Sequence, residues 1–204
     1  MTKAIEAEHG ARSRPAVLLA PNLLTIARIA AVPLIVACLV IEGPAARWAA
    51  FTLFVLAAVT DFVDGYLARR WSQFSALGVM LDPIADKLLV GVALVMLAGD
   101  GTISGANLVA AVVILAREIL ISGLREYLAG IETEVPVSRL AKWKTTIQLV
   151  ALSLLMAGEP GNGVVPGILA VGTALLWLAA LLTVTTGYDY LKAGIARVIA
   201  EEER

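Results

Sequence analysis

The chain has 204 residues, of which 59% are hydrophobic and 16% charged, and its formal net charge is -1. The apolar residues fall in several runs, each close to the roughly 20 residues that cross a bilayer, so an ordinary soluble domain is excluded. The balanced charge indicates no nucleic-acid partner, the lone Cys38 excludes an intrachain disulfide, and the lone His9 leaves acid–base chemistry to carboxylates, lysine or tyrosine.

Six apolar spans predict an all-α polytopic membrane protein built as one six-helix bundle. They cover residues 20–41, 46–69, 78–98, 103–128, 143–158 and 164–190. Glycine, proline or clustered polar residues separate them, as is typical of turns. We expect a polar N-terminal tail at 1–19, a membrane domain at 20–192 and a polar C-terminal tail at 193–204. The N-terminal tail lacks the pattern of a cleaved secretory signal, so the first span is expected to be retained.

Basic residues are unevenly shared between the two ends of the predicted bundle. One end carries the tails and the second and fourth loops, with Lys3, Arg12, Arg14, Arg69, Arg70, Arg139, Lys142, Lys144, Lys192, Arg197 and Arg204. The loops of the other end hold only Arg47. Because positively charged loops stay in the cytoplasm, both termini are expected there.

Four aspartates interrupt the second and third spans, where acidic residues are costly and usually mark function. Positions i, i+3, i+4 and i+7 share one face of a helix, and in the second span this face holds Asp61, Asp64, Gly65 and Ala68. The third span has a similar face of small and acidic residues, with Gly78, Asp82 and Asp86 at positions i, i+4 and i+8. A short loop makes the two helices antiparallel neighbours, so the acidic faces can converge at the cytoplasmic end.

Converging carboxylates repel one another unless they are protonated or bound to cations. Oxygen ligands suit magnesium, manganese or calcium, and paired metals about 3.5–4 Å apart commonly clamp transferring phosphates. Arg69 lies beside the acidic face and has the fork geometry that binds a phosphate oxygen. The pattern therefore predicts a divalent-metal site that handles a phosphate-bearing substrate.

Structural interpretations of the same residues remain open. Asp82 and Pro83 could be an N-cap followed by the first helical residue. Asp61 and Asp64 could form ion pairs with Lys87 and Arg69. Gly65 and Ala68 could serve helix packing alone.

The string from Asp61 to Asp86 resembles, without a mismatch, the signature D-x2-D-G-x2-A-R-x8-G-x3-D-x3-D of the CDP-alcohol phosphatidyltransferase family. The resemblance implies a six-helix membrane enzyme, usually a homodimer, that binds two divalent cations (Mg2+ or Mn2+) in a cavity facing the cytoplasm. Such enzymes transfer a phosphatidyl or related group from a CDP-linked donor to an alcohol and release CMP. By this similarity Asp61, Asp64 and Asp82 are metal ligands, and Asp86 is a ligand and the general base. The donor site would be lined by Asp61, Asp64, Gly65, Ala68, Arg69 and Gly78.

Three further segments resemble one branch of this family in particular. They are PNLLTIAR (21–28), REILISGLRE (117–126) and VSRLAKWKTT (137–146). This resemblance implies a location in a bacterial-type inner or plasma membrane. In that branch the donor is CDP-diacylglycerol and the acceptor is sn-glycerol 3-phosphate, and the product is phosphatidylglycerophosphate. The first segment would add Asn22, Thr25 and Arg28 to the donor site. Several cations together suit an acceptor that carries phosphate, and the candidates are Arg117, Arg125, Lys142 and Lys144.

These basic residues also have structural interpretations. Arg28 could extend along the helix to the lipid headgroups, and Arg117 and Glu118 could be a structural pair with other helices. The segment 138–146 could be a positively charged anchor with an interfacial tryptophan.

Two rival functions remain at this point. The same chemistry could use inositol phosphate, serine or phosphatidylglycerol as the acceptor. A cation transporter could also carry acids in its spans, although it would not need the spacing of Gly65, Ala68, Arg69 and Gly78. A purely structural subunit has no use for the acids.

Overall fold

The computed structural model describes residues 20–41, 43–71, 76–131 and 139–202. Within these ranges the chain forms six helices: α1 (Ala20–Ile41), α2 (Pro44–Trp71), α3 (Ala76–Gly99), α4 (Asn107–Gly130), α5 (Arg139–Val164) and α6 (Ile168–Glu202). The all-α prediction and the six predicted helices are confirmed for the described part of the chain. The predicted tail at 1–19 lies outside it.

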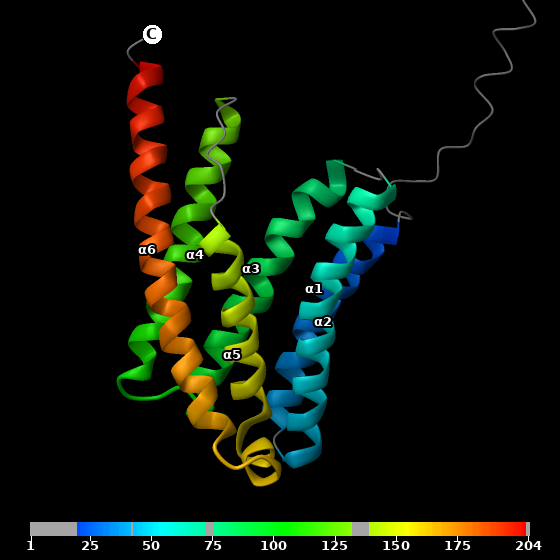
Figure 1. The fold of residues 1–204 in the computed structure, drawn as a ribbon. Helices are drawn as coiled ribbons and strands as arrows, with labels where there is room; N and C mark the ends of the chain where they lie inside the picture. Colours follow the sequence, from blue (N-terminus) through cyan, green and yellow to red (C-terminus); the bar gives the residue numbers. More distant parts are fainter. Residues whose placement is uncertain (1–19, 42, 72–75, 132–138, 203–204) are drawn as a thin grey trace, which may run out of the picture.

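Successive helices run in opposite directions (Figure 1). The start of α1, the end of α2 and the start of α3 therefore lie at the same end of the bundle as the end of α4, the start of α5 and the end of α6. We call this the aspartate end, because Asp61 is near the end of α2 and Asp82 and Asp86 lie in the first half of α3.

The bundle has two halves. In one half α1 packs against α2 and α3, and in the other α6 packs against α4 and α5. The contact between α2 and α5 joins the halves, while α3 meets α4 and α5 less extensively. The core between the halves is apolar, with Phe54, Leu97, Ile114, Leu152 and Met156 fully buried.

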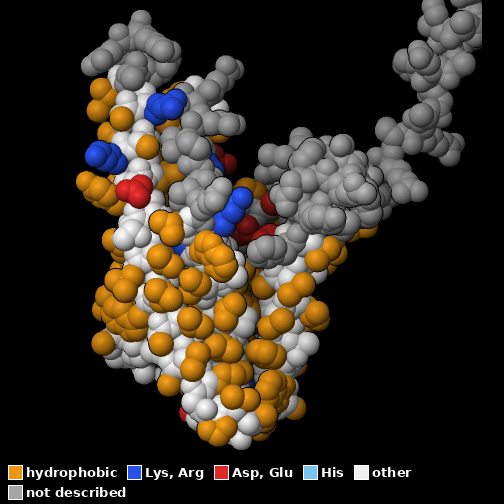
Figure 2. All heavy atoms as spheres, viewed as in Figure 1, with side chains coloured by type: hydrophobic (Ala, Val, Ile, Leu, Met, Phe, Trp, Pro, Cys, Tyr) orange, Lys and Arg blue, Asp and Glu red, His pale blue; other side chains and the backbone are white. Residues whose placement is uncertain are grey.

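Among the described residues, three helices are long and apolar enough to cross a membrane: α1 over Asn22–Ile41, α4 over Asn107–Gly130 and α6 over Ile168–Ile199. Hydrophobic side chains cover most of the face in Figure 2, and charged side chains gather mainly at the aspartate end, partly in the hollow between the halves. Six membrane crossings remain a prediction. Asp61 in α2 and Asp82 and Asp86 in α3, which interrupt the apolar sequences of these helices, belong to the candidate site.

The ends of α5 and α6 differ most from the prediction. Helix α6 continues to Glu202, past the predicted end of the last span at 190, because Asp189 and Lys192 end an apolar run without breaking a helix. Helix α5 is interrupted at Gly158, where φ is 60° and ψ is -155°, and then resumes to Val164. The turn predicted at residues 158–163 is therefore a single sharp break.

The side chain of Arg47 closes this break at the end of the bundle opposite the aspartates. Its guanidinium donates to the backbone oxygens of Met156 at 2.9 Å and Leu155 at 3.2 Å. It also donates to Thr102 Oγ1 at 2.8 Å and pairs with Asp100. Carbonyls near a helix end lack partners in their own helix, so Arg47 fixes the start of α2 to the break in α5.

Candidate active site

A buried polar face of α1 lies at the centre of the site. Asn22, Thr25 and Arg28 are spaced three residues apart and are 2%, 1% and 1% exposed. A three-residue spacing keeps side chains on one side of a helix over two turns. Polar groups are costly to bury without partners. These three side chains therefore need polar partners on the neighbouring helices.

Those neighbours are the predicted aspartates. Arg28 Nη1 lies 2.7 Å from Asp61 Oδ1 of α2 and 2.7 Å from Asp86 Oδ1 of α3. Thr25 Oγ1 donates to Asp82 Oδ1 at 2.6 Å. One face of α1 thus brings together carboxylates from two other helices, as the sequence predicted for Asp61, Asp82 and Asp86.

This geometry rejects two of the structural interpretations. Arg28 does not extend to the headgroups, because its side chain is fully buried between two carboxylates. Asp82 is not an N-cap, because α3 begins at Ala76 and Pro83 lies inside the helix. Asp61 pairs with Arg28, and the amino group of Lys87 donates instead to the backbone oxygen of Pro83 at 3.0 Å.

The carboxylates are open on one side. The side chain of Asp86 is 52% exposed and that of Asp61 is 30% exposed, while the Arg28 side chain that holds them is 0% exposed. Among the described residues, one guanidinium faces three carboxylates, so these side chains together carry more negative than positive charge. Acidic oxygen donors fit hard divalent cations such as Mg2+ and Mn2+.

The rest of the signature is placed only in part. Asp64, Gly65, Ala68 and Arg69 belong to α2, but their side chains lie outside the described residues. Gly78 is buried in the first turn of α3. Within the described residues, no group of three or more acidic, histidine or cysteine side chains is arranged to hold a metal ion. The described contacts converge on Thr25 and Arg28.

A second polar cluster lies between α4 and α5. The amino group of Lys144 pairs with Glu118 Oε1, and Arg117 Nη1 lies 3.4 Å from the same oxygen. Lys144 is only 2% exposed. Glu118 therefore pairs with another helix through Lys144, and Arg117 completes a group of three charges.

The other two predicted acceptor residues are not buried as Lys144 is. Lys142 is exposed, as is its neighbour Trp143, which is 66% exposed and suits an interfacial anchor. Arg125 is exposed and lies over the ring of Tyr190 in α6, 5.8 Å from its centre. The structure thus joins Arg117 and Lys144 through Glu118, a residue for which the sequence predicted only a structural role.

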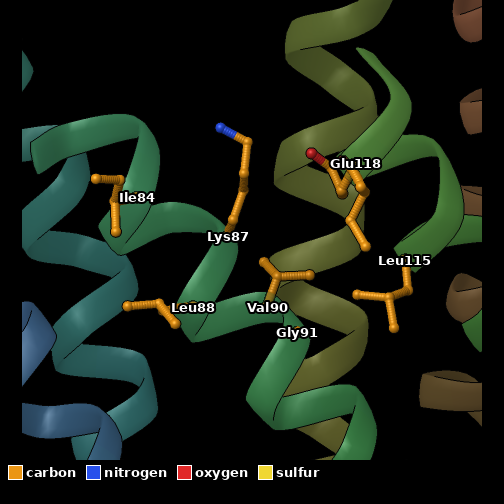
Figure 3. Close-up of a pocket in the computed structure, with 8 residues that line it drawn as sticks. Ile84, Lys87, Leu88, Val90, Gly91, Leu115 and Glu118 are labelled. Atoms are coloured by element: carbon orange, nitrogen blue, oxygen red, sulfur yellow. The ribbon is translucent and has the colours of Figure 1, made fainter. Parts of the chain in front are cut away.

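A pocket of about 300 Å3 lies between α3 and α4 (Figure 3). Its lining is Ile84, Lys87, Leu88, Val90, Gly91, Leu115, Glu118 and Ile119. Lys87 and Glu118 carry their charged atoms at the same end of the pocket, above the apolar side chains. Since Lys87 follows Asp86 in α3 and Glu118 bonds to Lys144, the polar end of this pocket connects the two clusters.

Comparisons with known proteins agree with this geometry. The family described as CDP-alcohol phosphatidyltransferase matches residues 18–185. A Rickettsia bellii protein is 51% identical over 85% of this chain and 93% of its own length, and a Cereibacter sphaeroides protein is 40% identical over 86% and 95%. Both are named CDP-diacylglycerol–glycerol-3-phosphate 3-phosphatidyltransferase. An Oryza sativa protein named cardiolipin synthase (CMP-forming) is 38% identical over 87% of this chain and 58% of its own length.

Proposed function

The chain belongs to the CDP-alcohol phosphatidyltransferase family, and from this premise we propose that it makes phosphatidylglycerophosphate for phospholipid synthesis. It transfers the phosphatidyl group of CDP-diacylglycerol to sn-glycerol 3-phosphate and releases CMP. The relatives that carry this activity in their names match most of the chain at 40–51% identity. The protein is an integral membrane enzyme, which agrees with its apolar helices.

One structural observation supports this proposal most strongly. Three aspartates from α2 and α3 meet the buried Thr25 and Arg28 of α1 at one end of an apolar bundle. A structural membrane subunit would have no reason to bury an arginine and gather acids around it. A phosphoryl-transfer site needs this kind of negative cluster to hold cations.

Asp61, Asp64, Asp82 and Asp86 would hold two divalent cations, Mg2+ or Mn2+. Bound there, the cations would offset the charge of the donor's diphosphate and of the leaving CMP. The buried guanidinium of Arg28 fixes the Asp61 and Asp86 carboxylates in position. The hydroxyl of Thr25 does the same for Asp82.

The donor's diphosphate would lie beside the small and basic residues of the signature, Gly65, Ala68, Arg69 and Gly78. Small residues allow a ligand to approach the helix backbone, and Arg69 would bind a phosphate oxygen. Arg28 and Thr25 were expected to contact the donor. Their described contacts are to aspartates, so we assign them to holding the carboxylates.

Asp86 is the residue that we assign as the general base. Its side chain is about half exposed, so an acceptor hydroxyl can reach it, while Arg28 holds one of its oxygens. It would take the proton of the glycerol 3-phosphate hydroxyl as that oxygen attacks the phosphorus. Arg117 and Lys144 would bind the acceptor's own phosphate. Lys142 and Arg125 are exposed, and we assign them no part in binding this phosphate.

We place the aspartate end of the bundle and both termini in the cytoplasm, because the basic loops belong to that end. Glycerol 3-phosphate is polar and would enter from water, while the lipid donor would enter from the bilayer. A homodimer in a bacterial-type inner membrane is part of the same proposal.

The test is CMP release by purified protein in detergent with CDP-diacylglycerol, magnesium and one acceptor at a time. We expect turnover with glycerol 3-phosphate, loss of turnover on chelation of the metal, and loss in Asp61→Ala. Asp189→Asn, which changes an exposed acid of α6, is the control and should keep activity. No CMP release from folded protein with any acceptor would favour a transporter.

Phosphatidylglycerol is the second candidate acceptor, supported by the rice relative named cardiolipin synthase. Inositol phosphate and serine complete the acceptor panel. Turnover with phosphatidylglycerol and none with glycerol 3-phosphate would keep the chemistry and replace the acceptor.

A further inference from the structure

Among the described residues, the cluster between α4 and α5 carries more positive than negative charge. There it contains Arg117 and Lys144 but one carboxylate, Glu118. The side chains are 17%, 3% and 20% exposed in that order, so water screens them only weakly. Charges in such surroundings interact more strongly than on an open surface.

Arg117 also has a donor that remains unused. Its Nε is buried and has no hydrogen-bond partner among the described residues. Helix α6 packs closely on this side chain, since a Cβ added at Gly187 would lie 3.1 Å from Arg117 Cγ. A buried N–H without a partner is unfavourable, so excess charge and an unused donor together indicate a site for an anion.

We propose that Glu118 is a positioning residue for the acceptor's phosphate. It pairs with Lys144 from α5 and with Arg117 from its own helix, and it keeps the two cations directed at the same point. Without this carboxylate, two like charges would repel at close range, and Lys144 would be a buried charge without compensation. This role rests on the proposed function, in which Arg117 and Lys144 bind that phosphate.

The position of Glu118 agrees with this role. Its side chain also lines the pocket between α3 and α4, opposite Lys87. Lys87 follows Asp86, the proposed base, by one residue in α3. A phosphate held beside Glu118 would therefore keep the rest of the acceptor at the polar end of the pocket, close to the helix that carries Asp86.

The sequence supplies a matched control eight residues further along α4. The dipeptide Arg117-Glu118 recurs as Arg125-Glu126, and there both side chains are exposed. Glu126→Gln removes the same charge from the same helix without touching the buried cluster. Comparing the two variants separates the role of this position from the general effect of a lost acidic charge.

The experiment measures kcat and the KM of each substrate for the wild type, Glu118→Gln and Glu126→Gln. We expect Glu118→Gln to raise the KM for glycerol 3-phosphate about tenfold or more, which is the scale of a lost charge-assisted hydrogen bond. The KM for CDP-diacylglycerol should stay unchanged, and Glu126→Gln should match the wild type. A glycerol 3-phosphate KM that is unchanged or lower in Glu118→Gln would overturn the proposal.

Glu118→Asp covers the case in which Glu118→Gln folds poorly. It keeps the charge on a shorter side chain, so the KM for glycerol 3-phosphate should lie between those of the wild type and Glu118→Gln. Equal losses for donor and acceptor would indicate a merely structural ion pair and would overturn the positioning role. If wild-type protein does not use glycerol 3-phosphate at all, the proposed function itself fails, and this outcome is visible before any variant is compared.

Discussion

Arg28 Nη1 of α1 lies 2.7 Å from Asp86 Oδ1 of α3, although the arginine side chain is fully buried and the aspartate side chain is about half exposed. The arginine thus lies behind the carboxylate and leaves its open side to the solvent. Because Arg28 also holds Asp61, one buried cation connects the two acidic helices. The exposed carboxylates owe their placement to a residue that the substrate need not touch.

Replacing Arg28 with methionine, which has a similar length and no charge, should abolish most CMP release and lower the melting temperature. The carboxylates would then repel without compensation, at a cost of about 1–3 kcal/mol, below that of a fully buried pair because Asp61 and Asp86 are partly exposed. Thermal unfolding in detergent and turnover measure the two effects. Arg197→Met, at an exposed position of α6, is the control, and full activity in Arg28→Met would reject the role of Arg28.

Thr25→Val removes a hydroxyl while keeping the shape of the side chain. Asp82 would lose a charge-assisted hydrogen bond of 2.6 Å, and such bonds contribute about 1.5–3 kcal/mol. We expect turnover to fall about tenfold or more and the magnesium concentration for half-maximal activity to rise. Thr52→Val is the control, because the hydroxyl of Thr52 bonds within its own helix, to the Trp48 oxygen, and to no other helix in the described part of the chain. An unchanged magnesium dependence would mean that Thr25 does not position Asp82.

Asp86→Asn should nearly abolish turnover, because an amide cannot take the proton of the acceptor hydroxyl. Donor binding should partly survive, since Asp61 and Asp82 still contact α1. Binding of CDP-diacylglycerol to the variant and single-turnover CMP release would measure the two separately. If metal and donor binding fell as much as turnover, Asp86 would be a ligand without a role as base.

Gly158→Ala should destabilise the protein more than Gly105→Ala does. Both glycines have a positive φ, 60° and 56°, which is unfavourable for alanine, and Gly158 also has a ψ of -155°, a combination that is nearly restricted to glycine. At Gly158 the new Cβ would also lie 2.5 Å from Arg47 Nε, whereas at Gly105 it meets nothing within 4 Å. The difference in melting temperature therefore measures the backbone strain at Gly158 together with the Arg47 contact. Equal losses would mean that neither the backbone at Gly158 nor Arg47 resists the added Cβ.

The helices and the acidic motif could be predicted from the sequence because both depend on local order. A run of apolar residues specifies a helix in a bilayer, since backbone groups must pair within the segment. The helical repeat then places Asp61 with Asp64, and Asp82 with Asp86, whatever surrounds them. Helix ends were less certain, as α6 shows, because polar residues such as Lys192 end an apolar span without ending a helix.

The sequence by itself thus determined the six helices, the acidic faces and the family to which they belong. Only the tertiary structure decided which partners those faces meet: that Arg28 holds Asp61 and Asp86, and that Lys144 turns inward to Glu118 while Lys142 faces outward. Periodicity fixes which residues share a side of one helix. The partner across the interface depends on how helices distant in sequence pack, and no local pattern records this packing.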